Sequence, residues 1–258
     1  MTAEFDPATP NMARVYDYWL DGKDNYPADR AEAQRLLTIY PPLRELVREN
    51  RAFVTRAVSW AARQGIVQFI DLGAGLPASP SVHQVAREAM PTARVAYVDV
   101  DAVVLSHARA LLATSGGVTA VAADLRDPNA VLANPELRTV IDPARPVCVI
   151  LGAVLHFLDA DTARTVTAGY ARLMAYGSCL VISVASFDDE ALGKQLAEEY
   201  TAAAWHNHTP ADIASFFAGL EPVGPGVTEA QTWRAWMPQP VLRHREGDVL
   251  VGVARRQA

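Results

Sequence analysis

The spacing of apolar positions predicts helices in the first part of the chain. Apolar residues recur there at intervals of three and four, as at Met12, Val15, Tyr16, Trp19 and Leu20. Asn11 is a candidate N-cap for this helix, and Gly22 is a candidate end. Two further helices are expected, one from Pro27 to Leu37 and a longer one from the Pro41-Pro42 pair to Gly65.

After Gly65 the pattern changes to short apolar runs separated by helical spacings. The predicted strands are Val67–Leu72, Arg94–Asp99, Val118–Ala123, Val147–Leu151, Cys179–Val184 and Asp248–Ala254. The predicted helices are Pro80–Ala89, Ala102–Leu112, Thr162–Met174, Asp188–Ala204 and one that starts at Thr209-Pro210. Apolar strands that alternate with helices form a parallel sheet covered on both faces, and such a sheet binds ligands at the carboxyl ends of its strands. The fold class is therefore α/β.

No linker separates an independent second domain. Residues 1–65 are expected to form an N-terminal helical cap or lid, as part of the same domain as a core of residues 66–258. The polar turn Gly22–Tyr26 joins the first two predicted helices, and packing alone does not explain its composition. We expect this turn to fold over the bound ligand.

Composition and charge disfavour several classes of partner. The 258 residues include 23 Lys and Arg and 29 Asp and Glu, so the net charge is −6 and neither nucleic acid nor an anionic membrane is an expected partner. No apolar run reaches the roughly 18 residues that a membrane-spanning helix needs. The N-terminal residues lack the basic and apolar segments of a secretory signal, so a cytoplasmic protein is expected.

The sequence predicts no metal site. Cys148 and Cys179 lie singly in two predicted strands, without the spacing of metal ligands. His206 and His208 form an H-x-H pair, but no third ligand stands at a helpful spacing. We therefore expect these histidines to be solvated loop residues.

The most informative motif is the segment FIDLGAG at residues 69–75. An apolar strand ends there in Asp71, and Gly73 and Gly75 then allow the backbone to approach a ligand closely. A carboxylate at this position would repel a diphosphate and attract an ammonium group. S-adenosylmethionine carries an ammonium and a sulfonium and has no phosphate, so the motif favours this cofactor.

Two more carboxylates end predicted strands at the same edge of the sheet. Asp99 is placed to accept hydrogen bonds from two ribose hydroxyls, and Asp124 is placed to accept from an adenine amino group. Other interpretations stay open. Residues 73–78 also fit the dinucleotide pattern G-x-G-x-x-A, with Asp99 as the ribose ligand of NAD. Asp71 is also a candidate helix N-cap, and Asp124 a candidate cap of the turn that follows it.

These segments resemble the motifs of class I S-adenosylmethionine-dependent methyltransferases. FIDLGAG resembles the first motif, YVDVD at 97–101 the second, AADL at 122–125 the third and VILGAVLH at 149–156 the fourth, and LMAYGSCLV at 173–181 resembles the segment leading into the fifth strand. The chain is also similar, over nearly its whole length, to an actinobacterial group of methyltransferase-like proteins catalogued as a domain of unknown function. The blocks that carry this closer resemblance are ARVYDYWLDGKDNY at 13–26, ENRAFV at 49–54 and QFIDLGAGLP at 68–77.

The resemblance implies a Rossmann-like, seven-stranded methyltransferase sheet whose last strand is antiparallel. It also implies cofactor contacts at the matched positions Asp71, Gly73, Ala74, Gly75, Asp99, Val100, Asp124, Leu125 and Ala153. S-adenosylhomocysteine would be the product. One departure is that Leu76-Pro77 stands where the class often has a third glycine, so the turn must have a different shape beyond Gly75.

Four further residues are candidates for catalysis or cofactor binding. His156 follows the fourth strand and is the candidate general base, although a structural or cofactor-stacking histidine is the alternative. Arg14 and Arg51 are candidates for binding the methionine carboxylate, or are ordinary surface charges. Tyr26 belongs to the proposed lid turn and is a further candidate for cofactor binding.

The resemblance also implies that the region after the fifth strand shapes the acceptor pocket. Its aromatic residues Trp205, Phe216, Trp233 and Trp236 suit an apolar or aromatic small molecule, although tryptophans more often lie in a core. The leading hypothesis is an S-adenosylmethionine-dependent methyltransferase that acts on a small molecule by in-line transfer. The alternatives are an NAD-dependent oxidoreductase and a non-catalytic S-adenosylmethionine-binding module. The sequence leaves the oligomeric state and the acceptor atom open.

Overall fold

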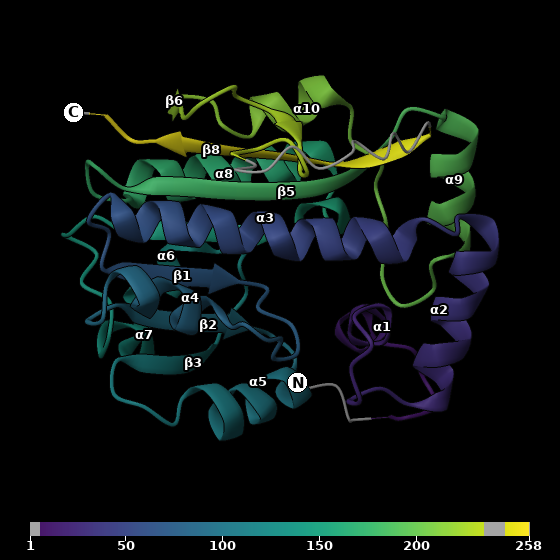
Figure 1. Cartoon of the computed structure of the whole chain (residues 1–258), viewed down its shortest axis with the longest axis horizontal. Coiled ribbons are helices and arrows are strands. Elements are labelled where there is room, and N and C mark those ends of the chain that lie inside the picture. The colour runs from purple at the N-terminus through teal and green to yellow at the C-terminus, as the bar shows by residue number, and fades with distance from the viewer. Residues whose placement is uncertain (1–5, 235–245, 258) are drawn as a thin grey trace.

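The structure is a computed structural model that describes residues 6–234 and 246–257. Its strands are β1 (Gln68–Leu72), β2 (Arg94–Asp99), β3 (Val118–Ala122), β4 (Cys148–Gly152), β5 (Cys179–Phe187), β6 (Glu221–Pro222), β7 (Thr228–Glu229) and β8 (Gly247–Arg255). They form one sheet in the order β3-β2-β1-β4-β5-β8-β6, and β7 also pairs with β8 (Figure 1). The first five strands are parallel and β8 is antiparallel to β5, which confirms the predicted α/β fold.

The far edge of the sheet differs from the expected seven strands. Two strands of only two residues each, β6 and β7, both pair with β8, so the described sheet has eight strands. Pro222 in β6 has no N–H to donate, and Gly224 and Gly226 have positive φ angles. The chain therefore leaves the sheet after β6 and then pairs with β8 a second time as β7.

Most helices lie close to their predicted positions. The helices are α1 (Met12–Trp19), α2 (Pro27–Ile39), α3 (Leu43–Arg63), α4 (Val82–Ala89), α5 (Ala102–His107), α6 (Pro128–Ala133), α7 (Pro135–Arg138), α8 (Ala160–Leu173), α9 (Glu190–Glu199) and α10 (Pro210–Ser215), with a π-helical turn η1 (Ala108–Leu112) and a 3₁₀ turn η2 (Leu155–Phe157). Helices α6 and α7 were not predicted. Asn11 caps α1 by accepting from the N–H groups of Ala13 and Arg14, as expected. Thr209 caps α10.

One predicted helix is too long. The segment expected to be helical from Asp188 to Ala204 ends as a helix at Glu199. The next residue, Tyr200, is extended and buries its ring, and the N–H of Thr201 donates to the Glu32 carboxylate over 2.6 Å. Tertiary contacts with α2 therefore override the helical spacing of the sequence.

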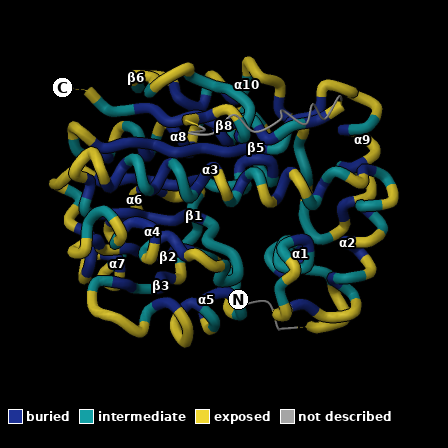
Figure 2. Tube along the Cα trace, in the orientation of Figure 1, coloured by how far each residue is buried: buried dark blue, intermediate teal, exposed yellow. Residues whose placement is uncertain are grey.

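Alternate side chains of the strands pack on opposite faces of the sheet. Phe69, Cys148 and Ile150 pack with α3 and α4 on one face, and Ile70 and Val149 pack with α6 and α8 on the other. Figure 2 shows the central strands as mostly buried, which explains why their sequences are almost continuously apolar. Both faces are covered, so the loops at the strand ends remain for ligand binding.

The first three helices have two different places in the structure. Helix α3 lies along the sheet and contacts β4, β5 and β8. Helices α1 and α2 lie beyond the ends of β1 and β2 in Figure 1, and α1 packs on both α2 and α3. The role of residues 1–65 as a cap or lid stays a prediction. Within the described ranges, the structure contains no helix with the length and apolar character needed to cross a bilayer.

Candidate functional site

A cavity of about 1140 Å³ lies at the carboxyl ends of the first four strands. Residues of α1 and α3 line its opposite side, so the cavity lies between the sheet edge and the N-terminal helices and is partly open. The predicted site residues that line it are Arg14, Arg51, Asp71, Gly73, Ala74, Gly75, Asp99, Val100, Asp124, Leu125, Ala153, His156 and Trp205. Its volume exceeds that of a typical pocket for one drug-sized molecule, so it can hold a nucleoside cofactor and a second compound.

Asp71 is the buried carboxyl group at the end of β1. Its side chain is 8% exposed, and burial raises the pKa of this carboxyl to about 7, with Asp99 adding to the increase and Arg51 opposing it. The alternative role as a helix N-cap is wrong, because Ser81 caps α4. Among the described residues, Arg51 is close enough to lower this pKa, but no cation forms an ion pair with the carboxyl, which is therefore suited to receive a cation from a ligand.

Asp99 links the glycine turn to the loop after β2. One carboxylate oxygen accepts from the N–H of Gly75 over 3.0 Å, and the other accepts from the N–H of Asp101 over 3.0 Å. Burial is the main cause of a raised pKa for this carboxyl. Each oxygen keeps a second lone pair, so Asp99 can still accept two hydroxyl groups while these backbone bonds fix its orientation.

The two glycines of the turn have different constraints. Both have positive φ, +67° at Gly73 and +63° at Gly75. A Cβ at Gly73 would lie 2.5 Å from Val154 Cγ1, whereas a Cβ at Gly75 would meet nothing within 4 Å. Gly73 is therefore required by packing against the β4 loop, and Gly75 borders the open space where a ligand would lie.

Asp124 is held by a neighbour that the sequence did not identify as a site residue. The Arg126 guanidinium binds the carboxylate through Nη2 at 2.5 Å and Nε at 2.9 Å, and lowers the pKa of Asp124. The backbone N–H of Arg126 also donates to Asp124 over 2.9 Å, so the predicted turn-capping role is present. Asp124 and Leu125 line the cavity, and their contact with adenine stays a prediction.

A chain of hydrogen bonds joins α1, α3 and the sheet beneath the cavity. Asn50 Nδ2 donates to the Tyr16 hydroxyl over 2.7 Å, and Asn50 Oδ1 accepts from the Ser183 hydroxyl over 2.5 Å. The Ser183 oxygen accepts in turn from the N–H of Ala153, whose φ of 56° is unusual for a residue other than glycine. Asn50 and Ser183 were not among the predicted site residues, because their pairing depends on residues far apart in the sequence.

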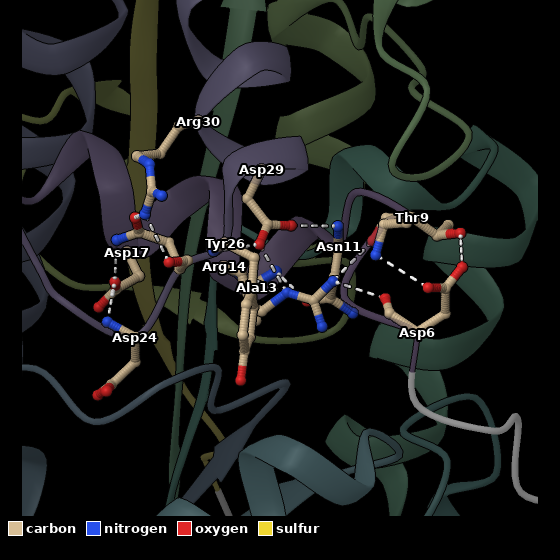
Figure 3. A network of polar contacts seen from close by, with 12 residues as sticks. Asp6, Thr9, Asn11, Ala13, Arg14, Asp17, Asp24, Tyr26, Asp29 and Arg30 are labelled. Atoms are coloured by element: carbon tan, nitrogen blue, oxygen red, sulfur yellow. Dashed lines mark hydrogen bonds and ion pairs between the residues drawn. The ribbon is translucent and has the colours of Figure 1, made fainter.

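The two candidate arginines differ in their surroundings. Arg14 is 4% exposed, its Nε binds Asp29 at 2.8 Å, and its Nη2 donates to the Thr9 carbonyl at 2.6 Å (Figure 3). The alternative of an ordinary surface charge is therefore wrong for Arg14. Arg51 donates to the Pro80 carbonyl over 3.0 Å and acts on the pKa of Asp71, so it lies close to the predicted methionine end of the cavity.

The N-terminal segment is tied to the loop after β2. Asn11 Nδ2 donates to Asp101 Oδ2 over 2.7 Å, and His107 Nε2 lies 3.7 Å from Asp24 Oδ1. Tyr26 is not among the cavity-lining residues, and the Arg14 guanidinium lies 5.3 Å from the centre of its ring (Figure 3). The structure thus brings α1 against the cavity and leaves the cofactor contact of Tyr26 as a prediction.

His156 forms part of an aromatic wall at another side of the cavity. It is 5% exposed, and its ring stacks on Trp205 with centroids 4.3 Å apart and planes at 20°. Burial, followed by the effect of His208, lowers the pKa of His156 to about 3. Phe216 and Trp233 are buried outside the cavity lining, and Trp236 lies outside the described residues.

The H-x-H pair serves the fold. His208 is 2% exposed, and its Nε2 lies 3.1 Å from the Leu155 carbonyl, so the prediction of a solvated loop residue is wrong for it. The N–H of His206 donates to the His156 carbonyl over 2.7 Å. These contacts attach the loop after α9 to η2. In the described part of the chain, no group of His, Cys, Asp and Glu side chains could hold a metal ion.

Comparison with known proteins gives the family and the fold. The model of a family described as S-adenosyl methyltransferase matches residues 1–257. The crystal structure of a candidate methyltransferase from Thermobifida fusca YX is 38% identical, with a TM-score of 0.88 over 97% of this chain and 96% of that one. A DUF574 family protein from Streptomyces avermitilis MA-4680 is 34% identical, with a TM-score of 0.88 over 97% of this chain and 99% of that one.

A more distant structure shares the fold alone. Human N-acetylserotonin methyltransferase, solved with S-adenosylmethionine, is 12% identical, with a TM-score of 0.51 over 96% of this chain and 63% of that chain. No curated protein matches the chain. The common architecture places the carboxyl ends of the parallel strands, and hence the cavity described above, at the usual ligand-binding edge of such a sheet.

Proposed function

The chain belongs to the S-adenosyl methyltransferase family, and from this premise we propose that it transfers a methyl group to a small molecule bound in the same cavity as the cofactor. The resemblance to an actinobacterial group is confirmed by the Thermobifida and Streptomyces relatives. The family also establishes S-adenosylmethionine as the methyl donor. The nature of the acceptor and the roles of individual residues are the content of the proposal.

The observation that carries the proposal is the continuity of the cavity. Its lining runs from Asp71 and Asp99 at the sheet edge to His156 and Trp205 at the aromatic wall. Helix α1 lines one side of this space and narrows access to it, which favours a compact acceptor over a polymer. A net charge of −6 also disfavours a nucleic-acid acceptor.

We assign the cofactor-binding roles to the sheet edge. The Asp71 carboxylate binds the ammonium group, Asp99 accepts the two ribose hydroxyls, and Arg51 is directed to the methionine carboxylate. The turn of Gly73, Ala74 and Gly75 permits close approach, and Val100, Asp124, Leu125 and Ala153 border the nucleoside. Arg14 contributes less than Arg51, because Asp29 and Thr9 already occupy its guanidinium.

The donor supplies a methyl group on a positively charged sulfur, which is already activated for displacement. A lone pair of the acceptor forms the new bond to carbon as the carbon–sulfur bond breaks, and the sulfur keeps that electron pair. The protein has to align the two groups and exclude water, which can supply much of the rate enhancement. A protonated acceptor atom must also lose its proton, and a nearby base is needed only in that case.

His156 is a weak candidate for that base. A side chain with a pKa of about 3 is neutral at ordinary pH and holds an added proton poorly. Its burial in the aromatic wall suits a positioning role better. The general-base role therefore stays a prediction, which is favoured only if acceptor binding changes the surroundings of the ring.

Equilibrium dialysis against S-adenosylhomocysteine and NADH tests the cofactor assignment, because Asp71 should repel the diphosphate of NADH. We expect binding of S-adenosylhomocysteine alone.

Incubation of cell extract with the protein and methyl-labelled donor then separates an enzyme from a non-catalytic binding module. A labelled small molecule that depends on the protein is expected, and its absence would favour the binding module. The cytoplasmic location expected from the sequence is kept as part of this proposal.

A further inference from the structure

The aromatic wall of the cavity is built from two segments that are distant in sequence. His156 and Phe157 belong to η2, and Tyr200 and Trp205 belong to the segment after α9. The rings contact one another: His156 and Phe157 are 4.4 Å apart between centroids, Phe157 and Tyr200 5.9 Å, and Tyr200 and Trp205 5.5 Å. All four line the cavity. We refer to these four residues as the aromatic wall.

Two nitrogen atoms of the aromatic wall lack hydrogen-bond partners. His156 Nδ1 and Trp205 Nε1 are both buried, and neither has a partner among the described residues. Buried polar atoms in folded proteins are nearly always paired, because an unpaired one loses its bonds to water without compensation. Among the described residues, His156 and Trp205 are the ones that both line the cavity and carry such an atom, whereas the unpaired Nε1 of Trp233 lies outside the lining. A ligand in the cavity is therefore in a position to complete the pairing.

The charges around the aromatic wall indicate an uncharged ligand. No carboxylate contributes to the pKa of His156, which is governed by burial and by His208. Glu32 is the acid that acts on Tyr200, but its carboxylate already binds Arg35 and accepts from the N–H of Thr201. Among the described residues, a cationic ligand would therefore find no free carboxylate at this side of the cavity, and no arginine or lysine is seen over any of the four rings.

We propose that the aromatic wall is the acceptor subsite and that it takes a flat, uncharged aromatic compound with one polar group. This group accepts a hydrogen bond from Trp205 Nε1 and forms a second hydrogen bond with His156 Nδ1. The inference rests on the proposed function, since it places the acceptor beside the donor in one cavity. The flat ring packs against the stacked side chains, and the polar group fixes its orientation. Trp205 contributes both the surface and the donor, so it is a determinant of specificity.

Hydrogen bonds made by the two histidines that follow Trp205, one through its backbone and one through its ring, support a defined position for Trp205. The N–H of His206 donates to the His156 carbonyl over 2.7 Å, and His208 lies 3.1 Å from the Leu155 carbonyl. These two contacts follow Trp205 directly and attach its loop to η2. The indole is therefore held against His156 by the backbone as well as by stacking.

Binding of 2-naphthol to the full chain saturated with S-adenosylhomocysteine tests the proposal. Saturation-transfer NMR titration measures this binding, with 2-methylnaphthalene as the ring without a hydroxyl and 2-naphthylmethylammonium as the charged ring. We expect 2-naphthol to bind more tightly than either comparison compound. Trp205→Phe keeps a ring and removes the N–H, so binding of 2-naphthol should weaken by about threefold to tenfold. Trp205→Leu should weaken it further.

Trp60→Phe is the matched control, because Trp60 packs on Trp233 outside the cavity lining. Calorimetry should show that all three variants bind S-adenosylhomocysteine within about twofold of the wild type, which also reports that each is folded. Equal affinity of wild type and Trp205→Phe for 2-naphthol, or no binding of 2-naphthol to the wild-type complex, would overturn the inference. Failure of the wild type to bind S-adenosylhomocysteine would instead overturn the cofactor assignment.

Discussion

At the sheet edge of the cavity, Asp71 and Asp99 stand at the ends of neighbouring strands, and backbone N–H groups already hold Asp99 in place. At the aromatic wall, His156 and Trp205 stack on each other, and each keeps a buried nitrogen that has no partner in the described part of the chain. The first region is polar and organised before any ligand arrives. The second is apolar and has hydrogen-bonding capacity that the protein itself does not use.

This difference shows how one cavity can bind a cofactor that a whole family shares and an acceptor that differs from one member to another. The sheet edge uses backbone geometry and carboxylates that the fold delivers to one place. The aromatic wall uses side chains from loops, which can vary without disturbing the sheet. Substitutions at the sheet edge should therefore alter the affinity for the cofactor and leave the affinity for 2-naphthol unchanged. Substitutions at the aromatic wall should alter the affinity for 2-naphthol and leave the affinity for the cofactor unchanged.

The largest expected effect is that of Asp99→Ala. It removes the proposed acceptor of the two ribose hydroxyls and also the partner of the Gly75 N–H, so calorimetry should show affinity for S-adenosylhomocysteine falling by at least about 100-fold. Asp99→Asn keeps one acceptor oxygen and should lose less. Asp161→Ala, at an exposed site on α8, is the control. Unchanged affinity in a folded Asp99→Ala protein would remove the main cofactor assignment.

Asp71→Asn should have an intermediate effect that depends on pH. The carboxyl has a pKa of about 7 in the empty site, and the ammonium group needs its charged form. Wild-type affinity should therefore rise up to about tenfold per pH unit towards pH 7 and level off above it. The variant should bind about 10- to 100-fold more weakly at pH 8 and lose this dependence. A similar pH profile in both proteins would contradict the role of Asp71.

The same substitution should have the opposite effect on stability. The carboxyl ionises near 3.8 in the unfolded chain and near 7 in the empty folded protein, so its burial costs free energy that grows as pH rises from about 4 to 7. Asparagine carries no charge. Asp71→Asn should therefore raise the free energy of unfolding above pH 7, by up to about 4 kcal/mol, and change it little at pH 4. Urea titration at the two pH values measures the difference.

The smallest expected effect concerns the tie between α1 and the loop after β2. Asn11→Ala removes the N-cap of α1, which should cost about 1 kcal/mol of stability, and also the bond to Asp101. Asn11→Ser keeps a capping oxygen but is too short to reach Asp101. Both variants should bind S-adenosylhomocysteine about two- to fivefold more weakly, whereas thermal unfolding should show a clear loss for alanine alone. Wild-type affinity for S-adenosylhomocysteine in both variants would contradict a contribution of α1 to cofactor binding.

The sequence predicted the sheet edge because its signals are local. Asp71 and Asp99 each follow an apolar run, and parallel strands bring such positions together whatever the surrounding helices do. The aromatic wall was only partly predictable. Trp205 was expected near the acceptor, but Phe216 and Trp233 proved to be core residues, since nothing local distinguishes an aromatic residue that packs inside from one that lines a cavity.

Predictions failed where distant contacts decide the structure. The helix expected from Asp188 to Ala204 stops at Glu199, because Tyr200 buries its ring and the N–H of Thr201 donates to the Glu32 carboxylate. His208 is buried, with its ring nitrogen 3.1 Å from the Leu155 carbonyl. The chain Tyr16–Asn50–Ser183 was also not predicted, because a single polar residue in a helix has many possible partners. Local spacing carries no information on such pairings.

The two hydrogen bonds of Asn50 have a consequence for how α3 sits on the sheet. Apolar packing is not directional, so by itself it fixes the position and rotation of a long amphipathic helix less sharply than hydrogen bonds do. A neutral amide bonded to Ser183 on one side and Tyr16 on the other removes that freedom at one turn of the helix. The position and orientation of the adjacent residue, Arg51, relative to Asp71 are thereby fixed as well. An uncharged side chain thus sets the geometry between two charged ones.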